Sequence, residues 1–165
     1  MIIREIAVED AEKLINLIKE IEAKSNFMLM EAGERKTTPE QQRKQLERIE
    51  QQSNSTIFVA EEKDKLVGYL FAMGGTVKKT KHSAYIVIGI LEEFRGKGIG
   101  TSLFKNVEQW GLKNNISRLE LTVVTQNKPG VALYKKSGFE IEGIKRNSLT
   151  INGKLFDEYY MSKLL

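Results

Sequence analysis

The chain has 165 residues, of which 41% are hydrophobic and 29% are charged, and it carries a formal net charge of +4 with no cysteine. This length suits one domain with a buried core, so we expect residues 1–165 to form a single domain. The absence of cysteine excludes disulfides, thiolate metal sites and a cysteine nucleophile, and no apolar run approaches the roughly 18–20 residues that cross a bilayer.

Hydrophobic periodicity predicts strands and amphipathic helices that belong to one sheet system. Apolar residues at every third or fourth position indicate helices, whereas alternating or continuous β-branched runs indicate strands. The first half contains a strand at 1–7, a helix at 10–23, a surface helix at 38–52 and strands at 56–61 and 66–75. The second half contains a strand at 84–91 that we expect to be buried on both faces, a helix from 99 to at least 110, a strand at 119–124, a helix at 129–137 and two strands within 139–165.

Local signals support this assignment at three places. Thr38 and Gln41 match a capping box with proline between them, which predicts the start of the second helix. Asn152-Gly153 is favoured in two-residue type I′ turns, so the chain should end in a β-hairpin. Residues 25–37 have no clear period and carry several apolar side chains, so we expect an irregular segment that lines a substrate site.

The most informative motif is Arg95-Gly96-Lys97-Gly98-Ile99-Gly100, which lies between the predicted strand at 84–91 and the helix that follows it. Alternate glycines allow a ligand to approach the backbone, and the first N–H groups of a helix have no intrahelical acceptor. The helix N-terminus adds about half a positive charge, which Arg95 and Lys97 would supplement. We therefore predict that this loop binds a pyrophosphate.

Two common glycine motifs do not match this loop. A Walker A motif needs a lysine directly after its last glycine, but Gly100 is followed by Thr101 and Ser102. The dinucleotide fingerprint has the spacing G-x-G-x-x-G on the first strand of the fold, whereas this G-x-G-x-G sequence begins near the middle of the chain. An ATPase loop and a nicotinamide or flavin site are therefore disfavoured.

The loop instead resembles motif A of the GCN5-related N-acetyltransferases, the GNAT family, in which the pattern is R/Q-x-x-G-x-G/A. Residues 127–139 resemble the second signature of the same family in the spacing of Asn127, Tyr134 and Gly138-Phe139, although the letters just before Tyr134 depart slightly from it. Two independent patterns in the right order identify the chain as a member of this family. The resemblance covers almost the full chain.

The resemblance implies an α/β (α+β) fold with a single twisted, mixed, mostly antiparallel sheet of about six to seven strands, flanked by about four helices. It also implies acetyl-CoA as the cosubstrate, bound where the strand at 84–91 splays from the strand at 119–124. Pantetheine would pair with the main chain of the first strand, and a backbone N–H near Ile90 would hold the thioester oxygen. The implied cofactor-binding residues are Ile88, Gly89, Ile90, Arg95, Gly96, Lys97, Gly98, Ile99, Gly100, Thr101, Asn127 and Tyr134.

Acyl transfer to an amine needs a neutral nucleophile, a stabilised oxyanion and a way to neutralise the departing thiolate. In the family, the tyrosine at the position of Tyr134 approaches the cofactor sulfur, which makes Tyr134 the implied general acid. Its alternative role is to pack its ring in the core. Asn127 would hydrogen-bond a pantetheine amide, and its alternative role is that of a helix cap or turn residue.

The base that deprotonates the amine is not decided by the sequence. Glu92 and Glu93 follow the central strand, and Glu31 and Glu34 lie in the irregular segment. We choose Glu93 as the catalytic carboxylate and assign Glu31 and Glu34 to the amine substrate. Holding both substrates together can itself supply much of the rate, so a strong base is not required.

We therefore predict an acetyl-CoA-dependent N-acetyltransferase that acts on a primary amine of a small amino-acid-like or polyamine-like molecule, by direct attack in a ternary complex. The alternatives are a protein N-terminal acetyltransferase of the ribosomal-protein type and a non-catalytic acetyl-CoA-binding sensor. The N-terminus lacks the basic and apolar regions of a secretory signal, so we expect a cytoplasmic protein without a membrane anchor. The resemblance also implies that the terminal hairpin can provide an edge for homodimerisation.

Two further partner classes are disfavoured. The basic cluster of Lys78, Lys79 and Lys81 lacks the interleaved aromatic residues that stack on bases, so we predict no nucleic-acid binding. The single histidine, His82, has no acidic or histidine partner at ligand spacing, so we predict no metal.

Overall fold

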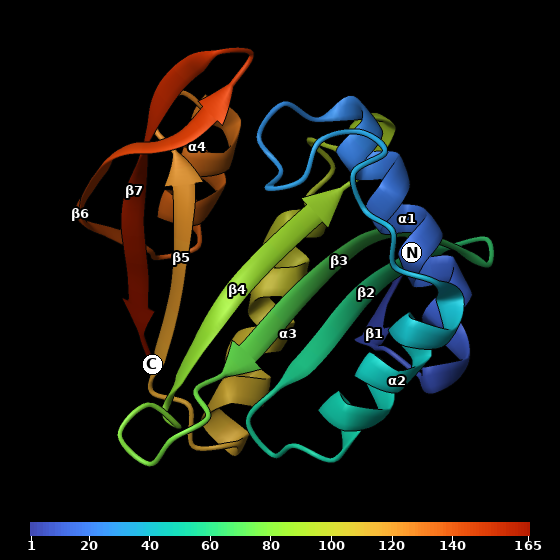
Figure 1. The fold of residues 1–165 in the computed structure, drawn as a ribbon. Helices are drawn as coiled ribbons and strands as arrows, with labels where there is room; N and C mark the ends of the chain where they lie inside the picture. The colour runs from blue at the N-terminus through green and yellow to red at the C-terminus, as the bar shows by residue number, and fades with distance from the viewer.

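The computed structural model describes residues 1–165, which form a seven-stranded sheet with helices on both faces (Figure 1). The strands are β1 (Ile2–Glu5), β2 (Thr56–Glu62), β3 (Lys65–Gly74), β4 (Ser83–Ile90), β5 (Arg118–Val124), β6 (Glu140–Ile151) and β7 (Lys154–Leu164). They lie in the order β1-β2-β3-β4-β5-β7-β6, and every neighbouring pair is antiparallel except β4 and β5, which are parallel. The predicted mixed, mostly antiparallel sheet is confirmed.

The four predicted helices are all present, close to their expected positions. They are α1 (Ala11–Lys24), α2 (Pro39–Glu50), α3 (Ile99–Lys113) and α4 (Lys128–Lys136), with short 3-10 helices η1 (Val8–Asp10) and η2 (Glu92–Phe94). Figure 1 shows α1 and α2 in front of the sheet and α3 and α4 behind it, and we call these two sides the α1 face and the α3 face. None of these helices is both long enough and apolar enough to span a bilayer.

The core lies where the apolar stripes of the helices meet the sheet. Leu103 and Val107 of α3 are fully buried, as the predicted stripe requires. Leu14 and Ile18 of α1 are buried on the opposite face. The strands between these helices are covered on both sides, and the first five residues of β2 are all buried.

Local side-chain and turn chemistry is as predicted. The Oγ1 of Thr38 accepts a hydrogen bond from the N–H of Gln41 at 3.2 Å, and the Gln41 side chain accepts one from the Thr38 N–H at 2.9 Å, which completes the capping box. Asn152 and Gly153 have φ values of 50° and 77°, the left-handed conformation that a type I′ turn requires. The terminal hairpin of β6 and β7 is therefore confirmed.

The expectation that β4 is buried on both faces is wrong. Ile86 is buried, and Ile90 on the same face lies beside Gly100 of α3. Tyr85 and Val87 point to the opposite face and are 40% and 39% exposed. Figure 1 gives the reason, because α1 lies over the strands on the side of β4 away from β5 and leaves this part of the α1 face open.

The parallel pair of β4 and β5 is short, and the two strands then diverge. Their last paired residues are Tyr85 and Glu120, although both strands continue well beyond this point. At the base of the gap, the hydroxyls of Tyr85 and Thr122 share a hydrogen bond of 2.8 Å. Figure 1 shows the gap widening toward the carboxyl ends of the strands, so the predicted splay is confirmed.

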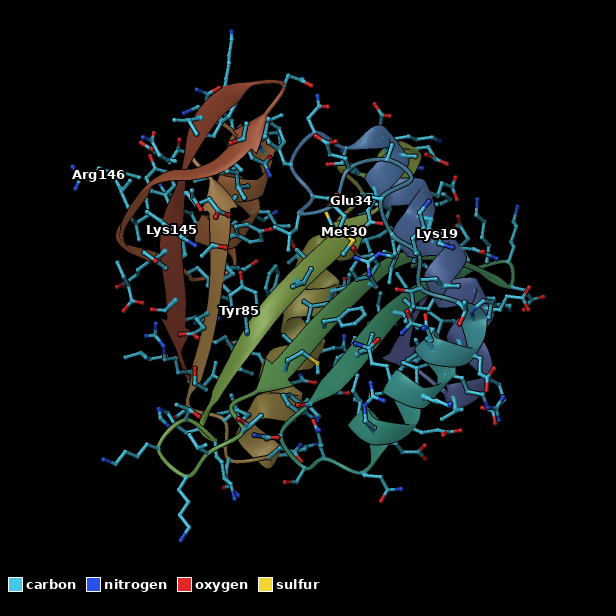
Figure 2. The ribbon with its side chains drawn as sticks, viewed as in Figure 1. Lys19, Met30, Glu34, Tyr85, Lys145 and Arg146 are labelled. Carbon is cyan, nitrogen blue, oxygen red and sulfur yellow. The ribbon has the colours of Figure 1, made fainter.

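The outer strand of the sheet, β6, has one unpaired edge. It carries exposed apolar side chains at Ile141 and Ile144. Figure 2 shows Lys145 and Arg146 on the same strand pointing outward. Homodimerisation through this edge stays a prediction.

Candidate active site

The divergence of β4 from β5 leaves main-chain groups of β4 without a strand partner. In an antiparallel pair, residues that exchange hydrogen bonds alternate with residues whose main chain points away from the partner. The N–H of Leu91 donates to the carbonyl of Val67 at 2.9 Å, so the odd-numbered residues of β4 face β3. Ile88 and Ile90 therefore direct their N–H and C=O groups toward β5, beyond the last β4–β5 pair.

Arg95 forms a hydrogen bond with one of these main-chain groups, and another has no hydrogen-bond partner. Its Nε donates a hydrogen bond to the carbonyl oxygen of Ile90 at 3.3 Å. The N–H of Ile90 has no acceptor within the chain. The gap thus contains a fixed backbone donor that can bind an oxygen atom as it gains negative charge.

The glycine loop has the open, donor-rich backbone that its sequence indicates. Gly96 and Gly98 have φ values of 73° and 82°, a conformation that residues with a Cβ atom rarely adopt. Gly98 is the N-cap of α3, and no side chain caps the helix there. The N–H groups of residues 96–101 make no hydrogen bond within the chain, so together with the positive end of α3 they can hold an anion.

The two basic residues of the loop have different contacts. Arg95 reaches back to Ile90, whereas the Lys97 ammonium lies 5.1 Å from the centre of the Phe94 ring. Both basic side chains are exposed. They therefore remain accessible to a phosphate bound at the loop.

Close packing between α3 and α4 brings Tyr134 to the same side of the gap. A Cβ atom at Gly100 would lie 2.8 Å from the end of the Leu133 side chain, so the glycine lets this leucine of α4 pack directly against the backbone of α3. The neighbouring Tyr134 ring packs edge-on against Phe104, with centroids 5.8 Å apart. Phe139 lies 6.2 Å from the Tyr134 ring and completes the aromatic cluster.

The Tyr134 hydroxyl makes no hydrogen bond, and its pKa is raised to about 12 by burial and, to a smaller extent, by the phenol of Tyr85. A phenol with this pKa is protonated at neutral pH, so it can donate a hydrogen bond. The ring and the hydroxyl therefore have separate roles, because the ring packs in the core while the hydroxyl remains available.

Asn127 combines the two roles that the sequence left open. Its Oδ1 accepts a hydrogen bond from the N–H of Gly130 at 3.1 Å and so caps α4. This cap uses the side-chain oxygen only. The amide nitrogen keeps its N–H groups, which can donate to a carbonyl of a bound ligand.

On the α1 face, an ion pair holds the irregular segment that links α1 to α2. Arg35 of this segment donates to both carboxylate oxygens of Glu22 on α1, from Nε at 3.0 Å and from Nη2 at 2.8 Å. The Glu22 side chain is only 3% exposed, so its charge depends on this partner. The same hydrogen bonds raise the pKa of Arg35.

The remaining predicted residues lie on exposed turns. The Glu34 carboxylate accepts a hydrogen bond from the Glu31 N–H at 3.2 Å and so closes a turn in the irregular segment. Figure 2 shows Met30 and Glu34 beside the carboxyl end of β4. Glu93 lies in η2, directly before the glycine loop, and its exposed carboxylate forms no ion pair. The predicted roles of Glu31, Glu34 and Glu93 stay predictions.

Sequence reasoning missed three residues of the α1 face, namely Tyr69, Glu22 and Arg35. A signal existed for Tyr69, because an isolated glycine inside a strand often marks the close approach of another group. That glycine is Gly89, where a Cβ atom would lie 2.7 Å from the Tyr69 ring. No local pattern indicates the Glu22–Arg35 pair, because the path of the irregular segment brings the two residues together.

Known proteins with similar sequences or structures are acetyltransferases. Residues 18–139 match the model of the Acetyltransferase (GNAT) family. The L-amino acid N-acetyltransferase AaaT of Escherichia coli is 31% identical over 100 residues, which cover 60% of this chain and 62% of that protein. A Bacillus subtilis protein, named for N-acetylation of alanine in ribosomal protein bS18, is 37% identical over 67 residues, which cover 41% of this chain and 44% of that protein. The crystal structure of a GNAT-family acetyltransferase from Streptococcus pneumoniae, 28% identical, has a TM-score of 0.96 and is matched over 99% of both chains.

The family match spans most of the chain, so the chain belongs to the acetyltransferase (GNAT) family. This confirms the resemblance drawn from the two sequence motifs. The chain spans less than two thirds of the length of each of the two sequence relatives named above.

Replacing Arg35 with alanine should destabilise the fold through Glu22. The free energy of unfolding should fall by about 3 kcal/mol at pH 7, because the variant leaves a buried carboxylate without its partner. Urea unfolding at pH 7 measures this loss.

Arg43→Ala is the matched control for Arg35→Ala. Arg43 pairs with Glu47 at 3.4 Å on the surface of α2, where both side chains are more than half exposed. Its removal should cost less than about 0.5 kcal/mol. Equal losses for the two arginine variants would contradict the role assigned to the buried pair.

Proposed function

We propose that this chain transfers the acetyl group of acetyl-CoA directly to a primary amine within a ternary complex. The observation that carries the proposal is the open N–H of Ile90, which lies in the gap between β4 and β5 beside the glycine loop. A backbone N–H in this position can donate a hydrogen bond to the oxyanion formed from the thioester. The glycine loop can bind the pyrophosphate of the same acetyl-CoA molecule.

The proposed cofactor site runs along the gap. Pantetheine is an extended chain with amides, so it can pair with the open main-chain groups of Ile88 and Ile90 like an added strand. The amide nitrogen of Asn127 would donate to a pantetheine carbonyl. The loop backbone at residues 96–101, with Arg95 and Lys97, would bind the pyrophosphate.

In the proposed reaction, the lone pair of a neutral amine attacks the thioester carbon. The Ile90 N–H stabilises the oxyanion, the C–N bond forms, and the C–S bond then breaks. The nitrogen loses one proton, and the CoA sulfur gains one. Removing one oxyanion donor typically costs about 10²- to 10³-fold in rate.

Tyr134 is the proposed donor to the departing sulfur. Burial raises its pKa to about 12, whereas a thiol has a pKa of about 8.5, so complete proton transfer from the phenol to the thiolate is uphill. We therefore assign Tyr134 a hydrogen bond that stabilises the developing thiolate, with solvent supplying the final proton. For the other proton, the exposed and unpaired carboxylate of Glu93 is our proposed acceptor.

We propose that the acceptor is a small amino-acid-like or polyamine-like amine. The printed name of the Escherichia coli relative, which specifies L-amino acids, supports this substrate class. The irregular segment, held by Glu22 and Arg35, supports it as well, because a fixed segment at the end of β4 restricts the approach of a bulky acceptor. The ribosomal-protein name of the Bacillus subtilis relative makes an N-terminal alanine the second candidate.

Free-thiol release from acetyl-CoA tests the proposed activity. The panel of acceptors contains amino acids, polyamines and peptides with an N-terminal alanine, and the acetylated product is identified by mass spectrometry. The proposal predicts release with at least one small amine. Release with the peptides alone would assign the ribosomal-protein type of activity, whereas tight CoA binding without release for any acceptor would support the sensor.

Tyr134→Phe should lower kcat by on the order of 100-fold and leave the Kd for CoA nearly unchanged, because the ring packing survives while the hydroxyl is lost. Tyr160→Phe, at an exposed position of β7, is the control. Since the pKa of Tyr134 is about 12, its ionisation should not reduce wild-type kcat below about pH 10. Unchanged turnover in Tyr134→Phe would remove this residue from the mechanism.

Gly98→Ala should weaken acetyl-CoA binding, with a rise in its KM of at least about tenfold, because alanine disfavours the left-handed conformation that opens the loop. Gly153→Ala is the matched control, since Gly153 has a similar φ of 77° and a Cβ there would also meet no atom within 4 Å. Both variants should lose about 1 kcal/mol of stability, but only Gly98→Ala should lose affinity. If Gly98→Ala and Gly153→Ala bound acetyl-CoA with equal affinity, the pyrophosphate would not bind at the glycine loop.

A further inference from the structure

Tyr69 of β3 places a phenol directly over the strand that lines the proposed cofactor site. A Cβ atom built on Gly89 would lie 2.7 Å from Cζ and 2.8 Å from the hydroxyl oxygen of Tyr69. The end of the Tyr69 side chain therefore covers Gly89 on the α1 face, one residue before the open N–H of Ile90. Only glycine at position 89 leaves room for this contact.

The Tyr69 hydroxyl has no hydrogen-bond partner, although the residue is only 2% exposed. Buried hydroxyls usually find a partner, so an unpartnered one calls for a physical reason. The only fully enclosed side-chain polar atoms without a partner are the hydroxyls of Ser83 and Ser137. The Tyr69 oxygen is not one of these fully enclosed atoms, so a small part of its surface remains accessible.

The surroundings of Tyr69 keep its phenol neutral. Burial and the nearby Glu22 carboxylate raise its pKa, although Arg35 acts in the opposite direction. A neutral phenol has both a lone pair and an O–H. It can accept a hydrogen bond from an amine N–H without competing with that amine for a full proton.

We propose that Tyr69 is an acceptor-binding residue whose hydroxyl oxygen accepts a hydrogen bond from the attacking amine and directs the nitrogen lone pair toward the thioester carbon. This inference rests on the proposed acetyl transfer. It places the amine over Gly89 on the α1 face, while Tyr134 on α4 reaches the sulfur from the α3 face. The two phenols would then act on opposite sides of the same thioester.

The ring of Tyr69 also has a structural role, which must be separated from the proposed role of its hydroxyl. It packs edge-on against Phe71, with centroids 5.4 Å apart, and contacts Gly89. Phenylalanine at position 69 would keep this packing and remove only an unpartnered oxygen. Such a change should leave stability the same or slightly higher.

The test compares wild type, Tyr69→Phe and the control Tyr159→Phe with the best amine found in the acceptor panel. Tyr159 is a partly buried tyrosine that packs against the core from β7. In Tyr69→Phe, kcat/KM for the amine should fall by about 10- to 100-fold, as expected for losing a hydrogen bond to the reacting group. The KM for acetyl-CoA and the urea midpoint should change little, and Tyr159→Phe should behave like wild type.

The outcomes separate this inference from the proposed function. If wild type acetylates the amine and Tyr69→Phe does so with unchanged kcat/KM, the inference is wrong while the proposed function stands. A parallel loss in amine kcat/KM, acetyl-CoA affinity and stability would show that the hydroxyl is structural, and would also overturn it. If wild type releases no thiol with any amine, the proposed function fails and the inference fails with it.

Discussion

The short pairing between β4 and β5 is the constraint on which the candidate site depends. If the parallel register continued beyond Tyr85 and Glu120, the main-chain groups of Ile88 and Ile90 would be used within the sheet. Because the strands diverge, these groups face a gap. Arg95 donates a hydrogen bond to the Ile90 carbonyl oxygen, whereas the Ile90 N–H has no acceptor. A backbone donor fixed in this way needs no reorganisation when charge develops on a bound oxygen.

The two faces of the sheet divide the proposed chemistry. On the α3 face, the glycine loop and Tyr134 would bind the cosubstrate, and Gly100 lets Leu133 of α4 pack directly against α3. On the α1 face, the ion pair of Glu22 with Arg35 holds the irregular segment near the carboxyl end of β4. Exposed positions of β4 and the phenol of Tyr69 lie on this second face, where an amine can approach. The thioester would lie between the two faces, in the gap itself.

Local sequence patterns predicted the features that local physics determines. The helix stripe, the capping box and the Asn152-Gly153 turn depend on neighbouring residues, and all three are present. The exposure of Tyr85 and Val87 was not predictable, because it depends on where α1 crosses the sheet. The Glu22–Arg35 pair depends in the same way on a tertiary contact. The family resemblance predicted that a backbone N–H near Ile90 would hold the thioester oxygen. The direction of that N–H could be established only from the register of β4 with β3.

The most direct test of the central claim is amide hydrogen exchange by NMR, with and without saturating CoA. If pantetheine pairs with the open edge of β4, CoA should slow exchange at the Ile88 and Ile90 amides by at least about tenfold. The Gly89 amide, which already faces β3, should change much less. Unchanged exchange at Ile88 and Ile90, in a protein shown to be saturated with CoA, would contradict the account.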